Sequence, residues 1–152
     1  MDEKNKLSFK QIIVISIFTG LGVIGGQLAF NYFTSGSISG KTRIDKALMQ
    51  TANEINKNLP LMLNQHTRLE TTIASPGNKF LYRYTILNID LNSFNDRQFT
   101  DEMKPRLINE YATKEEMKTF REMNVELTYS YLSEDGRELA SITISPEDFA
   151  TK

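Results

Sequence analysis

Residues 125–144 read VELTYSYLSEDGRELASITI, and this stretch decides the fold because it contains two strands and the turn that joins them. Its first half has apolar or aromatic side chains at every second position: Val125, Leu127, Tyr129 and Tyr131. Such alternation is typical of a strand with one buried face. Asp135-Gly136 favours a tight turn, and residues 139–144 form the returning strand. The stretch therefore predicts a β-hairpin.

A second hairpin is predicted upstream, over residues 66–90. Its first strand is half-buried, with one face formed by Thr67, Leu69, Thr71 and Ile73. The Ser-Pro-Gly-Asn sequence at 75–78 has the residue types of a turn. The second strand runs over 80–89 and places Phe80, Tyr82, Tyr84 and Ile86 on one face.

Helices are predicted before and between the hairpins. Apolar residues recur at three- and four-residue intervals over 44–59 and 99–111, and Pro105 is expected to bend the second helix or delay its start. Thr113 and Glu116 have the spacing of a capping box that opens a short third helix. The predicted fold class is α+β: residues 44–150 form an α-ββ-αα-ββ domain with an antiparallel sheet and helices packed on one face.

Residues 12–33 contain no charged side chain. As a helix they would span ~33 Å, enough to cross a bilayer core. They predict an N-terminal transmembrane helix, with a cleaved signal peptide and a buried helix as alternatives. Residues 1–11 are then a cytoplasmic tail, and the C-terminal domain is extracytoplasmic, or periplasmic. The predicted location is the inner (cytoplasmic) membrane, with a single pass and the N-terminus inside.

Two glycines of this predicted helix, Gly22 and Gly26, lie four residues apart on one helix face. A second helix could approach closely there, which predicts a homodimer through the transmembrane helix. The alternative is that glycine is simply common in membrane helices.

Residues 35–42, SGSISGKT, resemble a phosphate-binding loop, but Ser35 stands where that loop needs glycine. The composition of the stretch favours a flexible linker over residues 34–43. We expect no nucleotide or other cofactor.

The charges of the chain are nearly balanced, with 18 Lys and Arg against 19 Asp and Glu and no basic stripe. A nucleic-acid partner is therefore not expected. The chain has no cysteine, which excludes disulfides and thiolate metal sites. No metal site is predicted.

No catalytic residue is predicted. His66 is the only histidine, and a lone imidazole needs an orienting carboxylate and a nucleophile to act as a general base. We interpret it as an ordinary polar residue. The carboxylate pairs Glu115-Glu116 and Glu134-Asp135 have structural interpretations, the first at a helix N-terminus and the second in a hairpin turn.

The candidate interface consists of aromatic residues of two strands and one basic residue: Tyr82, Arg83, Tyr84, Tyr129 and Tyr131. If the strands are neighbours, the four rings form one ladder across the sheet. One interpretation is half-buried cross-strand pairs beneath the helices. The other is an exposed Tyr/Arg surface of the kind that protein interfaces favour.

Four stretches of the chain carry a family resemblance. In chain order they are NEINKNLPLMLNQHTRLE, KFLYRYTILN, TKEEMKTF and ELTYSYLSEDGRELASITISPEDF. Over about residues 54–149 the chain resembles a family of small, uncharacterised bacterial envelope proteins. The resemblance implies an envelope protein of this fold and no established activity. Members of the family carry cysteines near the positions of Ala112 and Phe149, which this chain lacks.

The predicted function is a non-catalytic, membrane-anchored interaction or assembly module of the bacterial cell envelope. Its expected partners are the membrane and another envelope membrane protein. Two alternatives remain open: a binder of a small ligand, lipid or envelope polymer, and an enzyme with no readable motif.

Overall fold

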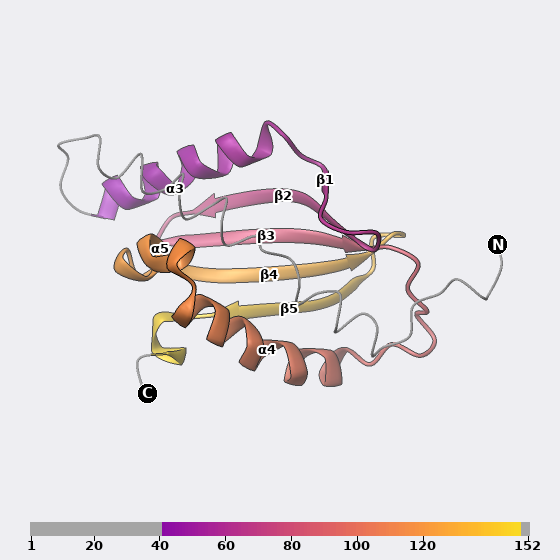
Figure 1. The fold of residues 1–152 in the computed structure, drawn as a ribbon. Helices are drawn as coiled ribbons and strands as arrows, with labels where there is room; N and C mark the ends of the chain where they lie inside the picture. Colours follow the sequence, from indigo (N-terminus) through magenta and orange to yellow (C-terminus); the bar gives the residue numbers. More distant parts are fainter. Residues whose placement is uncertain (1–40, 150–152) are drawn as a thin grey trace.

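A five-stranded sheet forms the centre of the computed structural model, which describes residues 41–149 (Figure 1). The strands lie side by side in the order in which the chain makes them. They are β1 (Leu61–Met62), β2 (Thr67–Ser75), β3 (Lys79–Ile86), β4 (Glu126–Ser133) and β5 (Glu138–Ile144).

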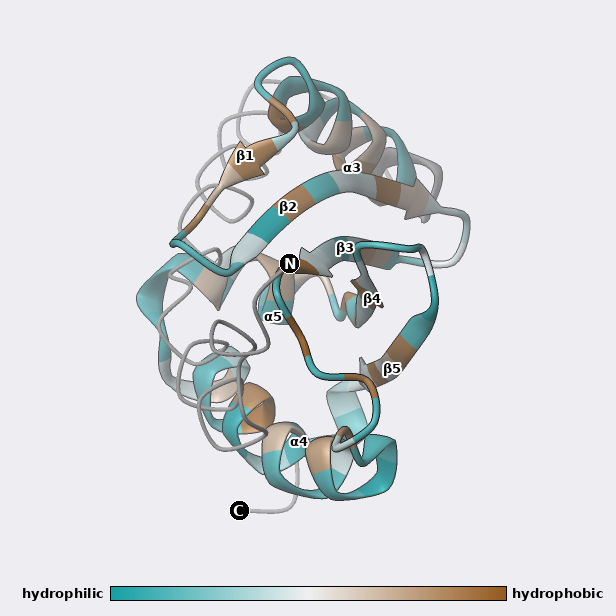
Figure 2. Ribbon diagram, turned by 90° about the vertical axis from the view of Figure 1, so that its right-hand side faces the viewer, coloured by the Kyte–Doolittle hydropathy of each residue, from teal (hydrophilic) through white to brown (hydrophobic). Residues whose placement is uncertain are grey.

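The helices of the described residues lie on one side of this sheet, as the edge-on view of Figure 2 shows. They are α3 (Lys41–Asn56), α4 (Asp96–Thr113), the 3-10 turn η2 (Glu115–Met117), α5 (Lys118–Glu122) and a second 3-10 turn, η3 (Pro146–Asp148). Helix α3 packs along β2 and α4 along β5, so the two long helices lie at opposite edges of the sheet.

The prediction of an antiparallel sheet is wrong at the centre of the sheet. The two hairpins, β2 with β3 and β4 with β5, are antiparallel. However, β3 and β4 pair in parallel, from Lys79 opposite Glu126 to Ile86 opposite Ser133. The cause is the connection: residues 87–125, which include α4 and α5, carry the chain back along the sheet before β4 begins. A crossover of this kind joins parallel neighbours.

The fifth strand, β1, was not predicted. Leu61 pairs with Leu69 and Met62 with Arg68, which adds a short strand to the β2 edge. A strand of two residues is too short to show the alternation from which strands are recognised.

The predicted transmembrane helix over 12–33, its tail 1–11 and the Gly22 and Gly26 pairing face lie outside the described residues. Within residues 41–149, no helix combines the length and the apolar character needed to cross a bilayer. Helix α3 begins at Lys41, so the end of the predicted linker 34–43 is helical. The described residues form an α+β domain with a mixed sheet, in place of the predicted transmembrane helix followed by an antiparallel-sheet domain.

Helix α4 begins earlier than predicted and continues through Pro105. The Asn95 side chain caps it by accepting a hydrogen bond from the Gln98 amide at 2.8 Å. The capping box predicted at Thr113 is absent, because the Thr113 hydroxyl donates to the Asn109 carbonyl at 2.7 Å inside α4. The spacing of Thr113 and Glu116 predicted a cap for the next helix, but α4 extends to Thr113 and uses its hydroxyl.

Helix α3 protects the β2 edge of the sheet where β1 has ended. The Asn56 side chain donates to the Thr72 carbonyl at 2.8 Å and accepts from the Thr72 amide at 2.8 Å. At the other end of β2, Asp45 accepts from the amides of Gly77 and Asn78 at 3.1 and 3.0 Å. A covered edge cannot template pairing with another chain.

The core lies between the helices and the sheet. Its largest fully buried side chains include Tyr82, Tyr111, Phe80, Phe99 and Phe120. The Tyr111 hydroxyl donates to the Val125 carbonyl at 2.7 Å, which ties α4 to the start of β4. The sheet face that bears this core is therefore committed to packing.

Candidate functional site

The four tyrosines of the predicted interface form a ladder on the helix-covered face of the sheet. Tyr82 lies opposite Tyr129 and Tyr84 opposite Tyr131 in the parallel pair. Their rings stack with centroid separations of 5.7 and 5.3 Å. The edge of Phe99, from α4, meets Tyr131 at 5.2 Å.

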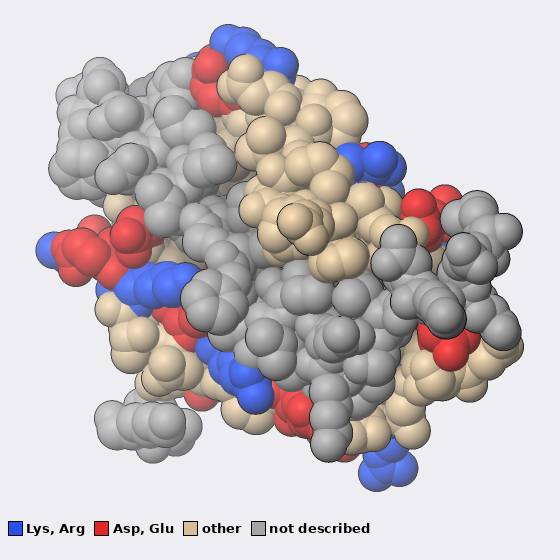
Figure 3. Space-filling model, turned by 45° about the vertical axis from the view of Figure 1, so that its right-hand side comes forward, with Lys and Arg blue, Asp and Glu red and all other residues tan. Residues whose placement is uncertain are grey.

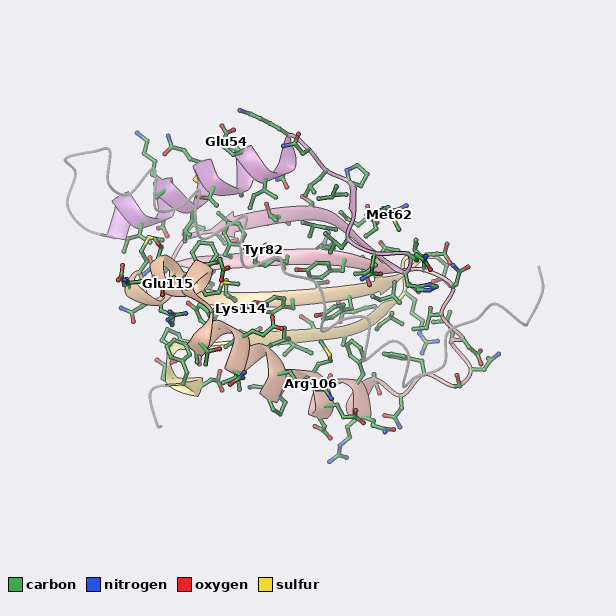
Figure 4. The ribbon with its side chains drawn as sticks, in the orientation of Figure 1. Glu54, Met62, Tyr82, Arg106, Lys114 and Glu115 are labelled. Carbon is green, nitrogen blue, oxygen red and sulfur yellow. The ribbon has the colours of Figure 1, made fainter. Side chains whose placement is uncertain are left out.

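These rings are buried in the core. The exposed fractions of Tyr82, Tyr84, Tyr129 and Tyr131 are 1%, 3%, 6% and 3%. Figure 4 shows Tyr82 over the central part of the sheet, in the area framed by α3, α4 and α5. The structure thus places the tyrosines inside the domain, and the interpretation of cross-strand pairs beneath the helices describes them.

Burial also removes the tyrosines from acid–base chemistry. It raises the pKa of all four phenols well above the usual value, because the charged form would lose its hydration. Neighbouring tyrosines add to the rise at Tyr84 and Tyr129. The ladder stays neutral at physiological pH and acts as packing.

Arg83, the remaining residue of the predicted interface, lies on the opposite face of the sheet. Successive strand residues point to opposite faces, and Arg83 alternates with the buried Tyr82 and Tyr84. We call this second side of the sheet the open face, because no described helix lies on it (Figure 2). Lys79, Glu126 and Glu138 lie on this face near the ends of their strands. Its other residues are Met62, Arg68, Thr71, Ile73, Leu81, Arg83, Thr85, Thr128, Ser130, Leu132, Ser141 and Thr143.

Apolar side chains reach solvent on the open face. Met62 and Ile73 are 47% and 40% exposed, and both belong to the small set of large hydrophobic residues that are exposed within residues 41–149. Leu81 lies opposite Ile73 on the next strand and is half-buried. Hydroxyl side chains fill most of the remainder, and Thr128 bonds Thr143 across the strands at 3.0 Å.

Arg83 is an unpaired cation at the centre of the open face. It lies in a row with Thr71 and Ser130 of the flanking strands. Its Nε is buried and has no hydrogen-bond partner among the described residues, and Arg83 enters no ion pair there. The neighbouring Arg68, by contrast, donates through Nε to Glu70 at 2.7 Å.

His66 lies just before β2 and is half-buried. Its amide donates to the Asn64 side chain at 2.8 Å, and its carbonyl accepts from the Leu87 amide at 2.9 Å. The imidazole Nδ1 is buried and has no partner in the described part of the chain. Within residues 41–149 no group of three or more His, Cys, Asp or Glu side chains could hold a metal ion.

Members of the carboxylate pairs make structural contacts. Glu115 forms an ion pair with Lys118 at 3.6 Å, and Glu134 accepts from the Asn88 amide at 2.9 Å. Asp135 accepts from the Ser133 hydroxyl, a bond that lowers the pKa of the Asp135 carboxyl below its ordinary value.

Charged residues elsewhere on the surface are mixed in sign. In Figure 3, Lys and Arg side chains lie next to Asp and Glu side chains over the described surface that faces the viewer. The open face is therefore distinguished by the types of its side chains and not by a large excess of charge of one sign. It offers exposed apolar groups and a cation without a counter-ion, a combination suited to contact with a protein surface.

Sequence reasoning missed Ile73 and Thr71 as open-face residues because of a β-bulge. The register of β2 shifts between Leu69 and Thr71, with Glu70 as the extra residue. A bulge moves the following side chains to the other face. Strict alternation from the buried Leu69 therefore placed Ile73 in the core, whereas Thr72 is buried in its place.

Comparisons with known proteins identify the family and the fold. The family model described as a domain of unknown function, DUF8479, matches residues 42–140. Protein K of Escherichia coli is 31% identical over 85 residues, which are 55% of this chain and 45% of Protein K. The chain thus matches less than half the length of that relative. The resemblance to an uncharacterised bacterial family is confirmed at this level.

Three solved structures share the fold at low sequence identity. A Pseudomonas aeruginosa protein inferred to be secreted is 14% identical, with a TM-score of 0.59 over 75% of this chain and 99% of that protein. The pilotin EpsS of the Vibrio vulnificus type 2 secretion system is 10% identical, with a TM-score of 0.58 over 74% and 96%. The type II secretion pilotin AspS of Vibrio cholerae is 9% identical, with a TM-score of 0.54 over 71% and 94%.

Proposed function

The chain belongs to the DUF8479 domain family, and from the structure of its domain we propose that it is a non-catalytic interaction or assembly module of the bacterial cell envelope. Its partner is another envelope protein. The observation that carries the proposal is the open face, which presents exposed apolar side chains and an unpaired arginine on the same surface.

The fold supports the envelope setting. Two of the proteins that share it are pilotins of type II secretion systems, and a third is inferred to be secreted. Because the identities are low, these likenesses establish the fold alone, and the envelope location and assembly role belong to the proposal.

The side chains of the domain favour binding over catalysis. The tyrosines are neutral packing residues, and members of the carboxylate pairs make structural contacts. The open face instead has the features of an interface. Interface cores are enriched in Met and Arg, and a few well-placed side chains supply most of the binding free energy.

The proposal predicts that Ile73→Lys reduces the amount of co-purifying envelope protein by at least about tenfold, because it places a flexible charge in the apolar part of the open face. The measurement is quantitative co-purification of the full chain from its native envelope in mild detergent. Each captured protein is compared between the wild-type and variant chains.

Met49→Lys is the matched control. Met49 lies on α3, away from the open face, and is 57% exposed, so it receives the same charge at a more exposed position. We expect it to leave every partner in place. Both variants should unfold at the wild-type temperature. If Ile73→Lys retains all the partners that the wild-type chain retains, the open face is not the binding surface.

A further inference from the structure

The guanidinium of Arg83 is the one group on the open face whose bonding the described residues leave incomplete at a buried atom. Its Nε is shielded from solvent and donates to nothing in residues 41–149. A buried donor without a partner is costly, and more so when it belongs to a charged group. Such a group stands out in a native structure because buried donors are nearly always satisfied.

Hydroxyl side chains lie directly beside Arg83 on the neighbouring strands. Ser130 of β4 lies directly opposite Arg83, and Ser141 of β5 lies opposite Ser130. Neither serine side chain forms a hydrogen bond within residues 41–149. Glu70 and Glu126 are already paired with Arg68 and Lys79 at 2.7 and 3.1 Å. Glu138 lies one row from Arg83, opposite Leu132, but on β5, two strands away.

We propose that Arg83 binds a carboxylate side chain presented by the protein partner, with Ser130 and Ser141 beside it as hydroxyl donors. This inference rests on the proposed function and specifies the partner: an extended or flat segment with an Asp or Glu among apolar residues. A carboxylate matches the fork of a guanidinium and accepts two parallel charge-assisted hydrogen bonds.

The apolar neighbours of Arg83 define the rest of the partner. Ile73 and Leu81 lie opposite each other in the next row of the face, on one side of Arg83. On the other side lie Thr85 and Leu132, which are also paired. Apolar side chains on either side of the partner's carboxylate would cover both rows. They exclude water from the ion pair between Arg83 and the carboxylate and so strengthen it.

The Arg68–Glu70 pair supplies an internal control. Arg68 has the same charge and lies on the same face, but its Nε already donates to a carboxylate at 2.7 Å. A partner carboxylate gains little there, because the new bond would replace an existing one. Charge attraction alone would recruit Arg68 and Arg83 alike, whereas the proposal requires Arg83.

The test uses two capped tripeptides, acetyl-Leu-Glu-Leu-amide and its isosteric analogue acetyl-Leu-Gln-Leu-amide, added to the full chain labelled with nitrogen-15. The readouts are the Arg83 Nε–Hε resonance and the backbone amides of Thr128 and Ser130. We expect the glutamate peptide to shift these signals and to bind at least about tenfold more tightly than the glutamine peptide. Arg83→Gln should weaken the glutamate peptide by a similar factor, and Arg68→Gln by less than about twofold.

Equal binding of the two peptides, no shift with the glutamate peptide up to its solubility limit, or equal losses from Arg83→Gln and Arg68→Gln would overturn the inference. Its failure can be separated from that of the proposed function. If Ile73→Lys removes the co-purified partners while Arg83→Gln keeps them, the interaction module stands and the carboxylate anchor is wrong. If Ile73→Lys keeps them, the open face itself fails, whatever the peptides do.

Discussion

Replacing Tyr131 with alanine is expected to lower the free energy of unfolding by about 3–5 kcal/mol, the range seen when a buried aromatic ring is removed. Tyr131 is 3% exposed and stacks on Tyr84, while Phe99 meets it edge-on. Its loss opens a cavity between α4 and the centre of the sheet. Such a loss is a large part of the stability of a typical domain. The chain has no tryptophan, so urea unfolding followed by far-ultraviolet circular dichroism is the suitable measurement.

Tyr131→Phe is the control for this prediction. It keeps the ring that contacts Tyr84 and Phe99 and removes only the hydroxyl, so the unfolding free energy should change by less than about 1 kcal/mol. The same variant should keep its binding partners. A Tyr131→Phe chain that is fully stable but has lost its partners would show that the tyrosine hydroxyl takes part in binding, contrary to our interpretation of this face.

The second large effect is expected at Asn56. Asn56→Ala should lower the unfolding free energy by about 2–3 kcal/mol. It leaves the Thr72 amide unpaired and the Thr72 carbonyl with only the long 3.4 Å bond from the Thr71 hydroxyl. Thr72 is only 2% exposed, so water does not readily replace the lost bonds. Hydrogen exchange of the Thr72 amide should accelerate in parallel, since its acceptor is the Asn56 side chain.

Asn58→Ala is the matched control, since Asn58 is the same residue type just beyond α3 and is exposed. It should leave the unfolding free energy within about 0.5 kcal/mol of wild type. Equal stability of the Asn56→Ala and wild-type chains would mean that α3 does not protect the β2 edge.

The sequence predicted the paired strands well because each shows alternation next to recognisable turn residues. Gly77 and Gly136 occupy the left-handed backbone conformation that these turns require, with φ of 88° and 84°. The sequence does not show whether β3 and β4, the strands at which the two hairpins meet, are parallel or antiparallel. Alternation is identical in parallel and antiparallel strands, and the long crossover over 87–125 determines the parallel pairing.

The candidate site was only partly predictable for a different reason. The spacing of Tyr82, Tyr84 and Arg83 correctly separates two faces of β3, and helices on one face were expected. The spacing of residues does not show which face of the strand the helices cover. From the sequence alone, the tyrosines and Arg83 therefore belong to one candidate interface. The bulge at Glu70, which turns Ile73 to the open face, has no clear signature in the sequence TRLETTI of residues 67–73.

The central claim is that the open face contacts a protein partner, and site-specific photocrosslinking in living cells tests it most directly. The photoreactive residue p-benzoylphenylalanine is placed in the full chain at Ile73, at Thr143 or at Met49. The first two positions lie on the open face, and Met49 lies on α3. Our account predicts a discrete adduct with an envelope protein from Ile73 and Thr143 and none from Met49. Adducts from Met49 alone, or none from either position on the open face, would contradict it.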